Sequence, residues 1–175
     1  MADDSTFQWI YRFTAKWERG DHHPTLADPN PTHAGVTQRT WDALAAQYGW
    51  RQASVFDLTD DEVMGVFRVI WTQCKAPGLP RLVAAAHFDF SVNTSGPRAN
   101  QTLQRAIGGV DVDGVIGPQT LNAANTKPPI EIARRYMGFR ENEYKSLAED
   151  HPNLQPNLKG WLNRCSDLRD YLGLA

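Results

Sequence analysis

Apolar residues recur at spacings of three and four along almost the whole chain, and this periodicity restricts the fold more than any other feature. It is typical of helices that bury one face against a core. Proline and glycine separate the helical segments, as at Pro77-Gly78 and Pro128-Pro129. We therefore predict an all-α fold with helices over residues 7–18, 37–48, 60–74, 80–93, 97–107, from 118, from 129, and over 161–172.

Two proline-containing segments interrupt the pattern. Within residues 19–36, Pro24, Pro29 and Pro31 exclude a helix and restrict a sheet, so we predict an irregular segment or a short hairpin. Residues 151–161 hold two further prolines and are predicted to be a loop. No low-complexity linker and no internal repeat is present in the sequence.

Capping residues mark several of the predicted helix boundaries. Thr37 is suited to cap the helix that follows it, and Gly49 is suited to end that helix. The run Thr59-Asp60-Asp61-Glu62 has the form of a capping box, in which the first and fourth residues exchange hydrogen bonds. These local signals agree with the apolar spacing.

Length and charge narrow the classes of function. A chain of 175 residues suits one domain, or one compact body with an appended lobe. The formal charge of -2 provides no large basic footprint for nucleic acid and no polybasic membrane patch. No apolar run approaches the roughly 20 residues that span a bilayer, so we expect no stable membrane insertion.

The first residues of the sequence and its two cysteines indicate the cellular compartment in which the chain is expected to be made. The first residues, Met-Ala-Asp-Asp-Ser, are acidic where a secretory signal is basic and then apolar. We therefore expect synthesis in the cytoplasm without a signal peptide. Cys74 and Cys165 lie far apart and in no metal-binding or redox spacing, so we expect two buried thiols rather than a disulfide.

Glu18 is the strongest candidate for chemistry. It shares the apolar face of the first predicted helix with Trp17 and lies where that helix stops. Desolvation and the negative end of the helix dipole both favour the neutral carboxyl form, which a general acid needs. The loop that follows offers Asp21 and Asp28 as ionised carboxylates, together with Thr32, and paired carboxyl groups are typical of glycoside hydrolysis. The alternative is an ordinary helix-end glutamate paired with a Lys or Arg.

The segment WERGDHHPTLADPNPTHAGVT, residues 17–37, resembles the signature of glycoside hydrolase family 108. That signature consists of a Glu, a glycine-containing turn, an Asp-containing loop and then Thr-x-x-Gly-Ile/Val-Thr. The matching positions are Glu18, Gly20, Thr32, Gly35, Val36 and Thr37. Residues 79–108 resemble the family's second helix and its junction, and VDVDGVIGPQTLNA and GWLNRCSDL resemble the peptidoglycan-binding lobe that is usually fused to it.

The resemblance implies a lysozyme-like fold and hydrolysis of the β-1,4 bond after N-acetylmuramic acid in bacterial peptidoglycan, with no cofactor. It implies a catalytic region over 1–95 and a C-terminal lobe over 96–175, packed into one body. The family's catalytic glutamate corresponds to Glu18, and its loop acid falls about one position before Asp28. On this hypothesis Glu18 protonates the glycosidic oxygen, and Asp28, or a water held by Asp28 and Thr32, stabilises or attacks the sugar.

This chain departs from the family pattern at two places in the loop. The common Glu-Gly-Gly-Tyr is Glu18-Arg19-Gly20-Asp21 here, and a glycine pair is replaced by Asn30-Pro31, which stiffens the loop. Both departures affect the assignment of the second catalytic residue more than they affect the fold.

Four further residues are candidates for substrate binding. The first, His33, is either a surface residue of the loop or a sugar contact. Trp50 follows Gly49 in a loop and is the tryptophan best placed to stack on a sugar, whereas most tryptophans at helical spacing are core residues. Asp89 and Asn93 lie one helical turn apart and either line a cleft or serve the structure, with Asp89 paired to an Arg.

Other activities remain as alternatives. A zinc site of His22, His23, Asp28 and His33 would make the chain a wall amidase or peptidase, although no ligand pair has helical spacing. A binding module without activity and a secretion-associated protein, as some relatives of the family are named, are the other two. For the enzyme we expect a monomer that acts on the cell wall after release, in the manner of an endolysin released through the pore of a holin-type partner.

Overall fold

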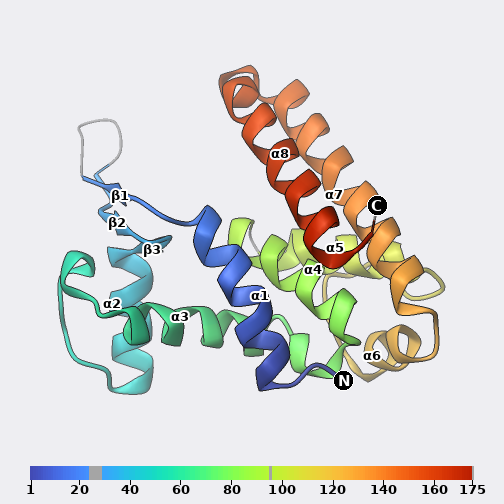
Figure 1. The fold of residues 1–175 in the computed structure, drawn as a ribbon, viewed down its shortest axis with the longest axis horizontal. Helices are drawn as coiled ribbons and strands as arrows, with labels where there is room; N and C mark the ends of the chain where they lie inside the picture. The colour runs from blue at the N-terminus through green and yellow to red at the C-terminus, as the bar shows by residue number, and fades with distance from the viewer. Residues whose placement is uncertain (24–28, 95, 175) are drawn as a thin grey trace. The chain divides into compact units, whose positions relative to one another are not determined.

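The computed structural model describes residues 1–23, 29–94 and 96–174. The chain divides into a small unit, residues 11–69, and a large unit, residues 1–10 and 70–175. The described residues are mainly helical and include one small three-stranded sheet (Figure 1). The all-α, lysozyme-like prediction is therefore confirmed, and the short hairpin predicted within residues 19–36 is part of that sheet.

The small unit contains the sheet. The sheet is antiparallel, in the order β1-β2-β3 (Figure 1). Its register pairs Asp21 with His33 and Thr32 with Thr37. The elements that lie wholly or partly in this unit are α1 (Asp4–Trp17), β1 (Asp21–His22), β2 (Thr32–His33), β3 (Val36–Thr37), α2 (Gln38–Tyr48), η1 (Val55–Asp57) and α3 (Asp60–Gln73).

The predicted caps explain why α2 and α3 begin and end where they do. The Thr37 side chain accepts a hydrogen bond from the Thr40 amide at 3.1 Å, and Gly49 ends α2 with a left-handed φ of 69°. At the start of α3, the Glu62 carboxylate accepts from the Thr59 amide at 2.9 Å, and the Thr59 hydroxyl accepts from the Glu62 amide at 3.3 Å. This reciprocal pair is the predicted capping box.

The large unit is built around α4 (Arg81–Asn93), in which eight consecutive residues from Val83 to Phe90 are buried. Three small residues in this run, Ala84–Ala86, let neighbouring elements approach the helix closely. α4 contacts α5 (Gly96–Ile107) and α7 (Pro129–Asp150), and α7 lies beside α8 (Gln155–Leu172) (Figure 1). The remaining elements are η2 (Ala76–Gly78), α6 (Pro118–Asn125) and η3 (Pro152–Leu154).

The predicted loop over residues 151–161 is wrong in most of its length. Residues 152–154 form a 3-10 turn, and α8 begins at Gln155. Pro156 lies in the first turn of α8, where the amide that proline lacks has no helical partner in any case. Proline in this position therefore starts a helix and does not exclude one.

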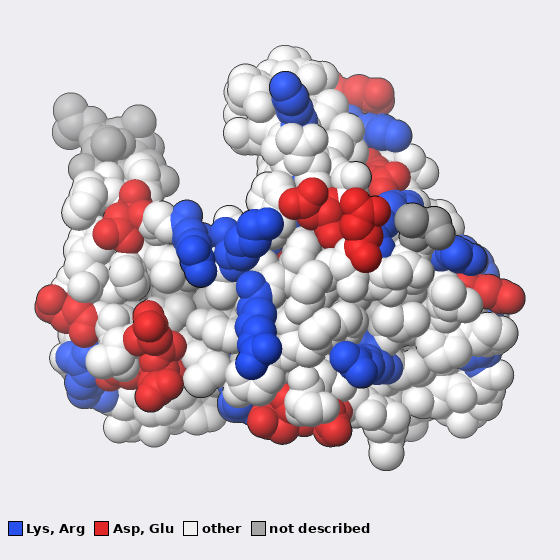
Figure 2. All heavy atoms as spheres, in the orientation of Figure 1, with Lys and Arg blue, Asp and Glu red and all other residues white. Residues whose placement is uncertain are grey.

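The cysteines, the surface charge and the helices can each be compared with what the sequence predicted. Cys74 and Cys165 are buried, unbonded thiols, as expected, and burial raises the pKa of each to about 11. On the face drawn in Figure 2, acidic and basic side chains are intermixed. Among the described residues, no helix has the length and apolar character to cross a membrane.

Candidate active site

Glu18 lies directly after α1, in the small unit. Its amide donates to the Thr14 carbonyl at 3.0 Å, which continues the helical hydrogen bonding one residue past Trp17. The side chain is partly buried. Gly20, with φ of 125°, then turns the chain into β1.

The turn between β2 and β3 lies against this helix end. It consists of Ala34 and Gly35, both with left-handed backbone (φ of 47° and 79°), as a tight two-residue hairpin requires. The Ala34 amide donates to the Gly20 carbonyl at 3.1 Å. Because this bond extends the pairing of Asp21 with His33, the backbone after Glu18 is attached directly to the turn.

Gly35 is in close contact with the Glu18 side chain. A Cβ atom placed at Gly35 would lie 2.8 Å from Cβ, 3.1 Å from Cγ and 3.0 Å from Oε2 of Glu18. A side chain of any size at position 35 would therefore displace the carboxyl group. The turn that connects β2 to β3 thus restricts the position of the Glu18 carboxyl group.

Thr32 and His33 occupy β2. The Thr32 hydroxyl is half-buried and donates to the Asn30 carbonyl at 3.3 Å. His33 Nδ1 lies 2.6 Å from Asp21 Oδ1, a contact that orients the imidazole ring. Asp28, the predicted second carboxylate, lies outside the described residues.

The predicted alternative of a zinc site involves His22, His23, Asp28 and His33. Among residues 1–23, 29–94 and 96–174, no group of three or more His, Cys, Asp or Glu side chains is arranged to hold a metal ion. Asp28, one of the four predicted ligands, lies outside the described residues, and His33 is hydrogen-bonded to Asp21 across the sheet.

Trp50 is half-buried and lies elsewhere in the small unit. Its amide donates to the Ala45 carbonyl at 3.0 Å, so the residue continues from the end of α2. Its ring packs against Tyr48 and Trp41, and Trp50 and Trp41 line a pocket.

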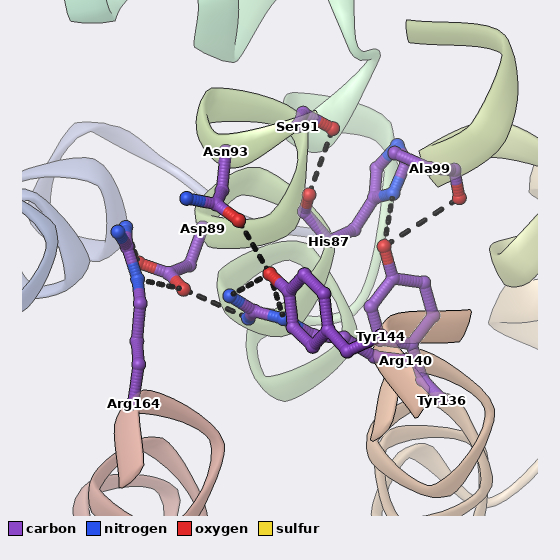
Figure 3. Close-up of polar contacts among 9 residues, drawn as sticks. All are labelled: His87, Asp89, Ser91, Asn93, Ala99, Tyr136, Arg140, Tyr144 and Arg164. Atoms are coloured by element: carbon purple, nitrogen blue, oxygen red, sulfur yellow. Dashed lines mark hydrogen bonds and ion pairs between the residues drawn. The ribbon is translucent and has the colours of Figure 1, made fainter. Parts of the chain in front are cut away.

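Asp89 lies in the large unit and is fully enclosed. Its Oδ2 accepts from Arg140 Nη1 at 2.8 Å, and its Oδ1 accepts from Arg164 Nη2 at 2.8 Å (Figure 3). Burial alone raises the pKa of Asp89, but the charges of Arg164 and Arg140 outweigh it and lower that pKa to about 2. Of the two interpretations of Asp89, the geometry favours the ion pair, because a side chain with 0% exposure does not line an open cleft.

Asn93 belongs to the same network. Its Oδ1 accepts from the Tyr144 hydroxyl at 2.5 Å, and that hydroxyl in turn accepts from Arg140 Nη2 at 3.2 Å (Figure 3). The residue itself is exposed at the end of α4. In this structure its amide oxygen joins α4 to α7.

Sequence reasoning missed the partners in both places. Arg140 and Arg164 are 51 and 75 positions from Asp89, and nothing in the local sequence connects them. The Gly-Val-Thr at the end of the motif marked Gly35 as a matching position in the sequence. The sequence did not reveal that this glycine lies in close contact with Glu18.

Two protein families match separate parts of the chain. Residues 11–95 match the family described as Glycosyl hydrolase 108, and residues 98–166 match the family described as Predicted Peptidoglycan domain. The first match includes the whole small unit, with Glu18, Thr32 and Gly35. No curated protein is significantly similar to the chain.

Among solved structures, the chain is similar to that of Brucella abortus SagA. The two are 28% identical, with a TM-score of 0.78, and the similarity covers 97% of this chain and 95% of the other. The likeness therefore extends over both family matches. The matches to Glycosyl hydrolase 108 over residues 11–95 and to Predicted Peptidoglycan domain over residues 98–166 together identify the chain as a glycoside hydrolase that acts on peptidoglycan.

Proposed function

We propose that the protein is an endolysin-type muramidase, which cleaves the β-1,4 bond between N-acetylmuramic acid and N-acetylglucosamine, with Glu18 as the general acid. The close packing of Glu18 against the Gly35 turn is the observation that carries this proposal. It supports a carboxyl group held in one position against the turn, and general acid catalysis requires such positioning. The family match over residues 11–95 supports the same chemistry.

The proposed reaction uses two carboxyl groups and a water. The Glu18 carboxyl donates its proton to the glycosidic oxygen as the bond to the anomeric carbon breaks, which leaves an oxocarbenium-like sugar. A water held by Asp28 and Thr32 adds to that carbon, and its proton passes to the Asp28 carboxylate. His33, whose Nδ1 is held by Asp21, is proposed to contact the sugar through its other ring nitrogen.

The predicted peptidoglycan domain, residues 98–166, is proposed to bind the wall during catalysis.

Asp89 and Asn93 are proposed to support the structure of the large unit, because their side-chain oxygens accept from Arg140, Arg164 and Tyr144.

Mass spectrometry of purified peptidoglycan after digestion tests the proposal. Wild type is expected to release muropeptides that end in reducing N-acetylmuramic acid. Glu18→Gln, which keeps the shape and removes the acid, is expected to release at least about a hundredfold less product. Glu149→Gln, at an exposed position of α7, is the charge-matched control and is expected to match wild type.

Two results would contradict the proposal. Wild-type activity in Glu18→Gln would exclude this residue as the acid. Free peptides on intact glycan strands would show cleavage of a different bond, that of an amidase or peptidase.

A further inference from the structure

A pocket of about 410 Å³ lies within the small unit. It is bordered by α2, by the segment that follows α2 and by the first turns of α3. This volume falls within the range of about 300–1,000 Å³ that is typical of small-ligand sites. The lining residues are Trp41, Trp50, Arg51, Asp61, Glu62 and Gly65, and none of them takes part in the reaction proposed at Glu18.

Aromatic rings supply the flat surface of this pocket. The Trp50 ring lies 5.5 Å from the Tyr48 ring at an interplanar angle of 25°, and 5.4 Å from the Trp41 ring at 34°. Trp41 is 1% exposed and anchors the group, whereas Tyr48 is 48% exposed and Trp50 is half-buried. A surface of this kind suits the apolar C–H face of a pyranose ring, since aromatic side chains combine apolar area with low conformational entropy.

Charged groups at the rim are held in place. The Arg51 guanidinium donates to both carboxylate oxygens of Glu62, through Nε at 2.5 Å and Nη2 at 2.8 Å. Its Nη2 also donates to the Asp57 carbonyl at 2.8 Å. With Asp61 the rim carries two acids and one base, a formal charge of -1. It therefore favours a neutral sugar, with hydroxyl and amide donors, over the carboxylates of a stem peptide.

Gly65 keeps this pocket open. It lies in the interior of α3, where glycine is the least favourable residue after proline. A Cβ atom at this position would lie 3.9 Å from Cη2 of Trp50, an ordinary contact, so a longer side chain would extend over the indole. The helix therefore carries an unfavourable residue at a position where a longer side chain would enter the pocket.

We propose that this pocket is an accessory glycan-binding site, which holds one or two neutral N-acetylhexosamine rings of a peptidoglycan strand against Trp50. The proposal rests on the proposed function, because the glycan strand is the polymer that the enzyme cleaves. In this proposal Trp50 contacts a sugar in a pocket whose lining does not include Glu18, Thr32 or His33. Its role is to retain the strand while a bond is cleaved at Glu18.

Indole resonances in a ¹H–¹⁵N NMR spectrum provide the test. The full chain with Glu18→Gln is titrated with the tetramer of N-acetylglucosamine, a neutral glycan without peptide. The Trp50 indole resonance, assigned from Trp50→Phe, is expected to shift with the sugar. Gly65→Leu, added to Glu18→Gln, is expected to abolish this shift, whereas Gly160→Leu, at an exposed helical glycine of α8 that lines no described pocket, is expected to preserve it.

A second variant guards against misfolding of Gly65→Leu. Trp50→Ala in the Glu18→Gln chain, measured by calorimetry, is expected to weaken tetramer binding by about tenfold through loss of stacking. Unchanged affinity in Trp50→Ala, or a Trp50 shift that persists in a folded Gly65→Leu, would overturn the proposal.

The remaining outcomes separate this site from the reaction. Absence of a Trp50 shift in a protein whose wild type releases reducing muropeptides would overturn the accessory site and leave the muramidase proposal standing. A shift with peptide-bearing muropeptides but not with the tetramer would overturn the glycan occupant in favour of a stem peptide.

Discussion

At the scale of single residues, Gly35 determines where the Glu18 carboxyl lies. Its left-handed φ of 79° disfavours any other residue, and a Cβ would come within 2.8 Å of Glu18. We expect Gly35→Ala to lower the free energy of unfolding by about 1–2 kcal/mol. Because a displacement of about 1 Å can reduce a rate about a hundredfold, we expect kcat to fall by that order while KM stays nearly constant.

Ala34 provides the matched control for this prediction. It also has a left-handed φ, of 47°, and it carries the Cβ that Gly35 lacks. Ala34→Gly is therefore expected to stabilise the turn by about 1 kcal/mol and to keep kcat. Steady-state kinetics and urea unfolding of both variants measure these effects, and a Gly35→Ala enzyme with wild-type kcat would disprove the positioning role.

At the scale of elements, the first turn of α3 depends on Glu62. This carboxylate caps the helix through Thr59 and pairs with Arg51, and the Arg51 hydrogen bond is the main reason that its pKa falls to about 2. A lowered folded-state pKa stabilises the protein above the ordinary value of 4.5, and this contribution is lost as the pH falls from 4.5 towards 2. Glu62→Gln keeps an oxygen that can accept from Thr59 but loses the charged pair with Arg51, so it is expected to cost up to about 1 kcal/mol at pH 7.

Urea unfolding at pH 7 and at steps below pH 4.5 measures this dependence. The difference between wild type and Glu62→Gln should shrink as the pH falls through that window, whereas Glu149→Gln should show no such trend. A difference that grows on acidification would contradict the assignment.

The interior glycine of α3 allows a second prediction at this scale. A Cβ at Gly65 meets only an ordinary contact, 3.9 Å from the Trp50 ring, so Gly65→Ala is expected to stabilise the protein by up to about 1 kcal/mol. Thermal unfolding measures this change. A lower Tm would show that the space beside Trp50 is smaller than the structure indicates.

At the scale of the whole molecule, one carboxylate joins three helices of the large unit. Asp89 on α4 accepts from Arg140 on α7 and from Arg164 on α8. Asp89→Asn leaves two buried guanidinium groups without a counter-charge, so we expect a loss of about 3–5 kcal/mol in the free energy of unfolding. Arg164→Met is expected to cost less, because the remaining Asp89–Arg140 pair is neutral and still hydrogen-bonded.

Urea denaturation of Asp89→Asn and Arg164→Met measures which variant loses more free energy of unfolding. Equal losses in the two variants, or a larger loss in Arg164→Met, would contradict the argument from charge. Binding of Asp89→Asn to the wall, measured on folded protein, is expected to be normal, since the Asp89 side chain has no exposed surface.

The domain boundary is also a feature of the whole molecule. The family matches meet between residues 95 and 98, close to the boundary predicted at 95/96, whereas the compact units change at residues 10/11 and 69/70. The reason is that α4 completes the core of the large unit although it belongs to the hydrolase match. The division into regions 1–95 and 96–175 therefore stays a prediction about sequence families.

Local sequence was sufficient to predict most of the helices and their caps, and it limited residues 19–36 to an irregular segment or a short hairpin. Apolar spacing, Thr37, Gly49 and the Thr59–Glu62 box act within one or two turns, so their effects can be derived from neighbouring residues. The start of α8 was missed because proline both interrupts helices and begins them, and position alone separates the two roles.

The surroundings of the candidate polar residues depend on the tertiary structure. Asp89 and Glu18 are both candidate site residues in the sequence, yet Asp89 is enclosed by two arginines 51 and 75 positions away, and Glu18 lies against Gly35. The same holds for the pocket at Trp50, which depends on a helix that begins ten residues later. Periodicity reports which side of an element faces the interior, but the groups that meet it there come from distant parts of the chain, and only the packed structure brings them together.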